Sequence, residues 1–211
     1  MHIVVVPASP KTGQATIRAL LADSSEPTVT STGTVGAQFE HGTALIGAAP
    51  EVVFVRCAYF MENWATAIQT MEAETPYLYS LICPADYTIP MVYVRDVGRT
   101  CTTQLLSAGS PLRSGENPYI VDLHGPKGYS TQDVQLALEH ATGNRVEARL
   151  VQDDQLEDFF AQAFEEPMTS LFVEMTRSFL PGRVAEKDMN GGVRVQRGED
   201  TLEATLRRMM A

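Results

Sequence analysis

Hydrophobic positions along the chain follow two patterns that alternate from one segment to the next. Short runs of β-branched and other apolar residues are typical of buried strands. They predict strands at residues 3–6, 28–32, 52–55, 89–94, 119–123 and 146–151. Apolar residues at helical spacing predict helices at residues 15–22, 65–71, 96–106, 131–142, 156–164, 168–180 and from 201 onward. This alternation, with helices gathering towards the C-terminus, predicts an α/β fold with a small α-rich cap.

Polar residues and breakers mark where several of these segments begin and end. The predicted helix signals are Asp96, the box Ser130-x-x-Asp133 with Gly143 as its stop, and Asp200-x-x-Glu203. Residues 74–86 contain two prolines and are expected to form a loop or a short edge hairpin. Residues 193–196 are expected to form a short edge segment.

One stretch does not fit a plain strand-to-helix connection. The apolar run 52–55 leads into Arg-Cys-Ala-Tyr-Phe-Met-Glu-Asn-Trp at residues 56–64. Surfaces rarely carry so many aromatic residues, and cores rarely accept an Arg, a Glu and an Asn together. The rings either cover the end of the sheet or form a pocket floor at the carboxyl end of a strand, where open α/β sheets bind ligands. We favour the pocket floor.

The first strand is followed by a loop that has the position of a phosphate-binding turn. Gly13 stands where the third glycine of such a turn allows helix and strand to pack closely, and Lys11 and Thr12 could offer a cation and a hydroxyl to an anion. Pro7 and Pro10 occupy the two earlier glycine positions, and proline has no N–H to offer a phosphate. A cofactor site and a simple turn are both consistent with this loop.

Composition and charge argue against several classes of protein. The chain has 211 residues, is 44% hydrophobic and 20% charged, and carries a formal net charge of −10, which argues against nucleic-acid binding. Three cysteines without CxxC spacing indicate neither a disulfide framework nor a metal site. The sequence shows no signal-peptide pattern and no apolar run of membrane-spanning length, so a soluble cytoplasmic protein is expected.

The chain resembles the NmrA-like family of atypical short-chain dehydrogenase/reductases. The passages that carry this resemblance are residues 4–20, "VFVRCAYFMENW", "IPMVYVRDVGR" and "LHGPKGYSTQDV". It implies a Rossmann-type domain with a closing C-terminal part, here at residues 1–128 and 129–211. It also implies NADP(H) or NAD(H) as cofactor, either in a reductase of small organic molecules or in a dinucleotide sensor.

The resemblance also suggests site residues. It places Lys11, Thr12, Gly13 and Arg56 on the cofactor and Tyr59, Phe60, Asn63 and Trp64 on the substrate side. Two features depart from the family. A short loop ending at Pro27 replaces whole strand–helix units, and no Tyr-x-x-x-Lys pair occurs in the chain. We therefore expect a truncated Rossmann-like parallel sheet in which residues 4–6 pair near Val29, or a homodimer that covers the gap.

Three functions are consistent with the sequence. The first is an NAD(P)-dependent reductase. The second is a cofactor-free descendant catalysing an isomerisation or cyclisation, with acids and bases among Tyr59, His41, His124, Glu62 and Asp96. The third is a non-catalytic ligand sensor. His124 as a turn histidine, His41 as a solvated one, and Asp96 as half of a structural pair with Arg95 are the plainer interpretations of these residues.

Overall fold

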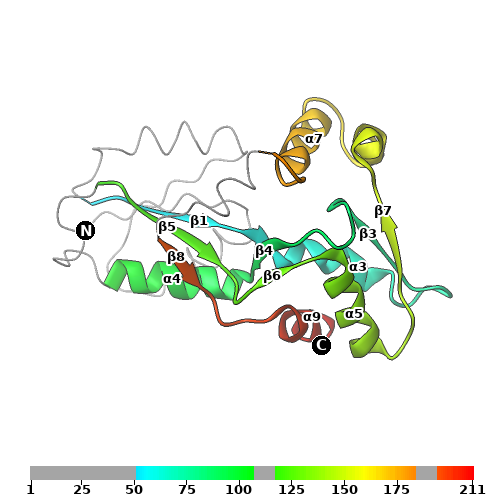
Figure 1. The fold of residues 1–211 in the computed structure, drawn as a ribbon, viewed down its shortest axis with the longest axis horizontal. Coiled ribbons are helices and arrows are strands. Elements are labelled where there is room, and N and C mark those ends of the chain that lie inside the picture. The colour runs from blue at the N-terminus through cyan, green and yellow to red at the C-terminus, as the bar shows by residue number, and fades with distance from the viewer. Residues whose placement is uncertain (1–50, 107–116, 184–193) are drawn as a thin grey trace.

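The computed structural model describes residues 51–106, 117–183 and 194–211 (Figure 1). The predicted strands at 3–6 and 28–32, the helix at 15–22 and the expected pairing of residues 4–6 near Val29 lie outside these described residues. Among the described helices, none combines the length and the apolar character needed to cross a membrane.

The described residues include a parallel sheet of three strands. Its order is β1 (Val53–Cys57), β5 (Tyr119–His124) and β8 (Val195–Arg197), all parallel. In the register, Cys57 lies opposite Leu123 and His124 opposite Arg197, so the carboxyl ends of all three strands meet at one edge. The strands predicted at 52–55 and 119–123 are thus both present, and the structure shows that they are neighbours.

Two smaller sheets extend the structure beyond this edge. β2 (Tyr59–Phe60) pairs in parallel with β4 (Ile89–Val92), which pairs antiparallel with β6 (Gly128–Tyr129). β3 (Tyr77–Ser80) pairs in parallel with β7 (Glu147–Leu150). Residues 74–86 therefore contain a strand of a parallel pair, which corrects the expected loop or hairpin.

Helices cover these sheets and close the C-terminal half. Their bounds are 3-10 helix η1 (Met61–Trp64), α3 (Ala65–Gln69), α4 (Val94–Leu106), α5 (Thr131–Thr142), 3-10 helix η3 (Asp153–Gln155), α6 (Leu156–Ala161), α7 (Met168–Ser178) and α9 (Leu202–Met210). The capping box of Ser130 and Asp133 is present, and Gly143 ends α5 with a φ of 72°. The last helix is capped by Thr201, whose hydroxyl accepts from the N–H of Ala204, and not by Asp200.

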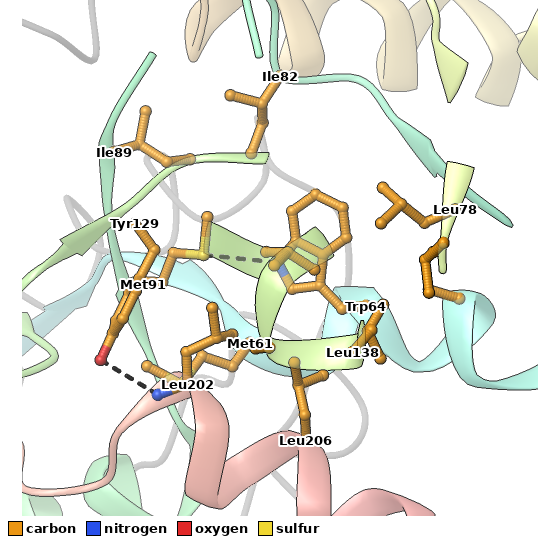
Figure 2. Close-up of a cluster of buried hydrophobic side chains, with 14 residues drawn as sticks. Met61, Trp64, Leu78, Ile82, Ile89, Met91, Tyr129, Leu138, Leu202 and Leu206 are labelled. Carbon is orange, nitrogen blue, oxygen red and sulfur yellow. Dashed lines mark hydrogen bonds between the residues drawn. The ribbon is translucent and has the colours of Figure 1, made fainter. Parts of the chain in front are cut away.

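The largest apolar cluster lies between β4, β6, η1, α5 and α9 (Figure 2). Trp64 is at its centre and donates its indole N–H to the Met91 sulfur at 3.5 Å. The Tyr129 hydroxyl accepts from the N–H of Leu202 at 3.1 Å, which fixes the start of α9 against the cluster. Residues 129–211 therefore share this core with residues before 128. The domain division at that point stays a prediction.

Two further clusters complete the described core. One lies between α4 and the β1–β5 sheet and contains Val92, Val97 and Leu123. The other holds α6 and α7 together around Leu156, Phe160 and Val173. Phe159 and Phe160 of the predicted helix at 156–164 therefore belong to a core, whereas Phe164 keeps 40% of its surface exposed.

Candidate functional site at the carboxyl end of the central strands

The ring-rich segment begins where β1 ends. The N–H of Ala58 donates to the carbonyl of Leu123 at 2.9 Å, so the chain stays beside β5 before it enters β2. Side chains alternate across a strand. Accordingly Tyr59 packs against the cluster around Trp64, whereas Phe60 packs against the cluster around Val97 and Leu123. The two neighbouring rings thus belong to different apolar clusters.

Tyr59 has the strongest chemical signature in this segment. Its ring lies edge-on to Phe179 at 5.7 Å between centroids and tilted against Trp64 at 6.2 Å. Burial raises the pKa of Tyr59 to about 12, and a side-chain hydrogen bond from Asn63 opposes this rise. The phenol is therefore a neutral proton donor at pH 7, oriented by an exposed amide one helical turn later.

Trp64 and Glu62 have structural roles. Trp64 is 3% exposed within the main core, and its predicted contact with substrate stays a prediction. Glu62 accepts a hydrogen bond from the N–H of Val94 at 2.9 Å and so satisfies a donor at the start of α4. Since α4 begins at Val94, Asp96 lies within its first turn and is not its N-cap residue.

Arg56 and His124 lie on one face of the β1–β5–β8 sheet. Arg56 is opposite Asp122 in the register and binds its carboxylate through two nitrogens, at 2.6 and 2.9 Å. His124 follows two residues later on the same face. Burial lowers the pKa of His124, Arg197 lowers it further, and Asp122 acts in the opposite direction, so its imidazole is neutral at pH 7.

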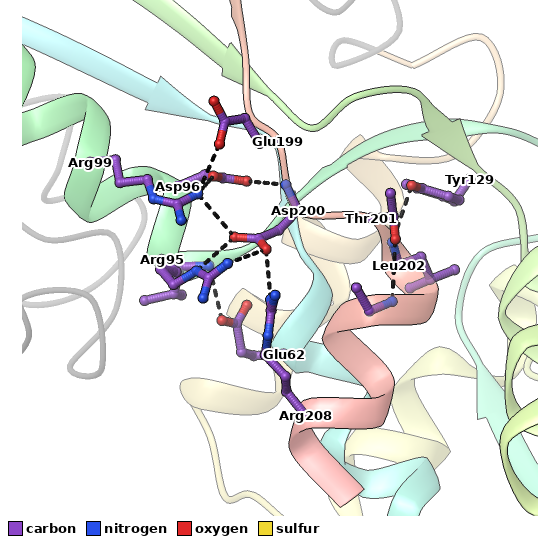
Figure 3. Close-up of polar contacts among 12 residues, drawn as sticks. Glu62, Arg95, Asp96, Arg99, Tyr129, Glu199, Asp200, Thr201, Leu202 and Arg208 are labelled. Carbon is purple, nitrogen blue, oxygen red and sulfur yellow. Dashed lines mark hydrogen bonds and ion pairs between the residues drawn. The ribbon is translucent and has the colours of Figure 1, made fainter. Parts of the chain in front are cut away.

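A charged cluster joins the start of α4 to the start of α9 (Figure 3). The buried carboxylate of Asp200 accepts from Arg95 at 2.6 and 2.9 Å and from Arg208 at 2.6 Å. Asp96 binds Arg99 at 3.1 Å and accepts from the backbone N–H of Asp200 at 3.0 Å. Arg95 thus pairs with Asp200 and Asp96 with Arg99, which differs from the expected pairing of Arg95 with Asp96.

The three cysteine thiols lie in surroundings that disfavour the thiolate form. Burial raises the pKa of Cys57 to about 12, with a smaller contribution from Cys101, and burial also raises the pKa values of Cys83 and Cys101. They are therefore neutral thiols at pH 7. Within residues 51–106, 117–183 and 194–211, no group of three His, Cys, Asp or Glu side chains could hold a metal ion.

The structure brings together only part of the predicted site. Tyr59 and Asn63 form a pair, Arg56 and His124 share one face of the β1–β5–β8 sheet, and Phe60 and Trp64 contribute to packing. Lys11, Thr12, Gly13 and His41 lie outside the described residues, as do Pro7 and Pro10. The role of Tyr59, Phe60 and Asn63 as a pocket floor stays a prediction.

Sequence reasoning missed two residues next to this site. Asp122 was detectable, because it is the one carboxylate within the apolar strand at 119–123, beside a strand that ends in Arg56. Phe179 was not detectable, because its contact with Tyr59 joins positions far apart in the chain. The sequence around a helix end does not indicate which distant residue an aromatic side chain at that end will contact.

Next to Phe179 the described residues form a hollow of about 380 Å³. It is lined by Cys83, Pro84, Leu150, Gln152, Asp153, Leu180, Pro181 and Arg183. None of the ring-rich residues 56–64 lines it. Leu180 lines the hollow, and the preceding residue, Phe179, contacts the Tyr59 ring.

Comparison with solved structures shows which fold the chain has. Of the solved structures, a nucleoside-diphosphate-sugar epimerase from Staphylococcus aureus matches with a TM-score of 0.60 at 12% identity, over 98% of this chain and all of that one. An isoflavone reductase matches with a TM-score of 0.56 at 13% identity, over 97% of this chain and 74% of that one. The fold is Rossmann-like. No family model and no curated protein matches the sequence.

The Rossmann-like fold confirms the predicted α/β class with parallel sheets. At these identities the likeness concerns the fold alone. Membership of the NmrA-like group stays a prediction, and so do the substrate and the nicotinamide cofactor.

Proposed function

We propose that this Rossmann-like protein is an oxidoreductase that binds NADP(H) or NAD(H) and acts on a small organic molecule at the carboxyl end of β1 and β5. The observation that carries the proposal is the Tyr59 hydroxyl, which Asn63 orients at the edge where open α/β sheets bind their ligands. A phenol with a pKa of about 12 stays protonated at pH 7 and suits proton donation to a carbonyl oxygen that gains negative charge.

The cofactor would supply the hydride. Lys11, Thr12 and Gly13 are the residues that we propose for its phosphates, and they lie outside the described part of the chain. Arg56 would help to position the site. Two of its nitrogens already bind the Asp122 carboxylate, and this ion pair anchors the end of β1. Tyr59 then donates its proton to the substrate oxygen and recovers one from solvent.

A redox-neutral isomerase is the weaker candidate for this site. Such a reaction needs a base close to the acid. Among the described residues, Asn63 is the polar side chain that influences the ionisation of Tyr59, and an amide is no base. His124 lies on the sheet face of Arg56 and Asp122, while Tyr59 packs with Trp64 and Phe179. This arrangement favours a proton donor that works with an external reductant.

The first experiment tests cofactor binding through Trp64, the single tryptophan of the chain. NADPH and NADH are titrated in turn while Trp64 fluorescence is followed, with Lys11→Ala as the variant that weakens the phosphate contacts. Saturable quenching by one nucleotide, weakened in Lys11→Ala, supports the proposal. Unchanged fluorescence together with no binding by calorimetry excludes a dinucleotide-dependent function.

The second experiment tests the role of Tyr59. Oxidation of the bound reduced nucleotide is followed with a panel of small aldehydes and ketones. Tyr59→Phe should lower kcat by about 10²-fold while nucleotide binding is unchanged, since general acid catalysis contributes on that scale. Tyr79→Phe removes the hydroxyl of a half-exposed tyrosine on β3 and should leave kcat unchanged.

The outcomes of the second experiment separate the candidate functions. Nucleotide binding without turnover of any tested compound indicates a sensor. Conversion of a compound without nucleotide indicates the redox-neutral alternative. A cytoplasmic location and assembly as a homodimer accompany the proposal as expectations, the second to be checked by light scattering.

A further inference from the structure

The hollow beside α7 is built from three separate segments. Cys83 and Pro84 come from the chain after β3, and Leu150, Gln152 and Asp153 come from the end of β7 and the start of η3. The turn after α7 supplies the third side with Leu180, Pro181 and Arg183. A volume of about 380 Å³ is within the range of small-molecule sites.

The turn after α7 gives Arg183 a defined place at this hollow. Gly182 has a φ of 76°, a conformation that side chains rarely adopt, and the N–H of Arg183 donates to the carbonyl of Leu180 at 3.2 Å. The turn is therefore closed by its own backbone. On the α7 side, Arg177 binds Asp153 of η3 at 2.5 Å, which holds the end of α7 beside η3.

Two arginines and one carboxylate lie beside the hollow. Asp153 is bound closely by Arg177, whereas its ion pair with Arg183 is 3.6 Å long, beyond hydrogen-bond distance. Two guanidinium groups thus share one carboxylate, which leaves one net positive charge in this trio. The Arg183 side chain is 56% exposed and presents a planar donor group that suits a second carboxylate.

We propose that this hollow binds a small organic anion with an apolar body and a carboxylate. The apolar body would lie against Pro84, Leu150 and Leu180, and the carboxylate would bind Arg183. Cys83 lines the same space, and its thiol donates to the carbonyl of Val151 at 3.4 Å. The site is separate from Tyr59 and does not depend on the proposed cofactor.

The test measures how fast iodoacetamide, an uncharged reagent, alkylates Cys83, with each cysteine quantified by peptide mass spectrometry. Benzoate is the probe, and benzamide is its uncharged match of nearly the same shape. Benzoate should slow alkylation of Cys83 in a saturable manner, and benzamide should slow it far less. Cys57 and Cys101 lie in another cluster and serve as internal references.

Two variants locate the effect. Arg183→Gln should weaken the protection by benzoate by about tenfold, as expected for one charge-assisted contact that is partly exposed. Arg145→Gln removes an exposed arginine after α5 and should leave the protection unchanged. Absence of protection by benzoate overturns the proposal. Equal protection by benzamide, or full protection in Arg183→Gln, also overturns it, because the carboxylate would then have no partner at Arg183.

Discussion

Tyr59 and Trp64 show how two rings of the same short segment acquire different roles. Both are aromatic, both follow β1, and their rings are in contact. The turn of η1 places Trp64 inside the main cluster, whereas Tyr59 keeps a hydroxyl that reaches the exposed side chain of Asn63. The sequence predicted that this segment matters, but not which ring is buried, since that depends on the residues packed from β4 and α9.

Gly125 is a residue whose replacement has a clear expected cost. It follows β5, its N–H donates to the carbonyl of Met91 at 2.9 Å, and a Cβ at this position would clash with that same carbonyl. We predict that Gly125→Ala lowers the free energy of unfolding by about 1–3 kcal/mol, because overpacking forces the backbone to move. Urea denaturation followed by Trp64 fluorescence measures this change.

Gly98 provides the matched control. It lies within α4, and apart from the adjacent backbone of that helix and its two chain neighbours a Cβ there would meet no atom within 4 Å. Gly98→Ala should raise the free energy of unfolding by about 0.5–1 kcal/mol, because alanine favours the helix. A Gly125→Ala variant as stable as the parent would show that the Met91 carbonyl does not restrict this turn.

At the scale of elements, α9 is held through its first residues. Thr201 caps the helix, Tyr129 binds the N–H of Leu202, and Asp200 binds arginines from both α4 and α9. The sequence predicted a cap one residue too early, since Asp200 and Thr201 are both good capping residues. Asp200 is occupied by arginines that are distant in sequence, so the neighbouring threonine takes the cap.

The second stability prediction concerns Asp200. Replacing it by asparagine leaves Arg95 and Arg208 without their buried carboxylate and should lower the free energy of unfolding by about 2–3 kcal/mol, the scale of hydrogen bonds to charged groups. Glu199→Gln is the control, because the Glu199 side chain is 84% exposed, and it should change stability little. Urea denaturation at pH 7 compares the variants.

The same residue predicts a pH dependence. Burial alone would raise the pKa of Asp200, but hydrogen bonds from Arg95 and Arg208 hold it below its ordinary value in the folded protein. The stabilisation is therefore fully present above the pKa of the unfolded chain, about 3.9. It is lost as the pH falls through the lower folded value. The stability difference between the parent and Asp200→Asn should shrink below about pH 4, and a constant difference would contradict the assignment.

At the scale of the whole molecule, local patterns predicted most described elements but not their partners. Apolar runs gave β1, β4, β5 and β7, and helical spacing gave α4, α5 and α7 within a few residues. The parallel pairing of β3 with β7 was missed, because two prolines dominate residues 74–86 and the partner strand comes much later. The ion pairs of Arg56 and Asp200 also join distant residues, so no local pattern could define the candidate site completely.

The segment from residue 194 to 211 crosses from one half of the molecule to the other. It adds β8 to the sheet of β1 and β5 and then lays Leu202 and Leu206 of α9 into the main cluster. During synthesis on the ribosome, a nascent chain that has emerged only as far as residue 193 lacks both contributions. Without β8 and α9, the described sheet would end at β5 and the main cluster would lose the cover of Leu202 and Leu206, so such a partly emerged chain would be prone to aggregate.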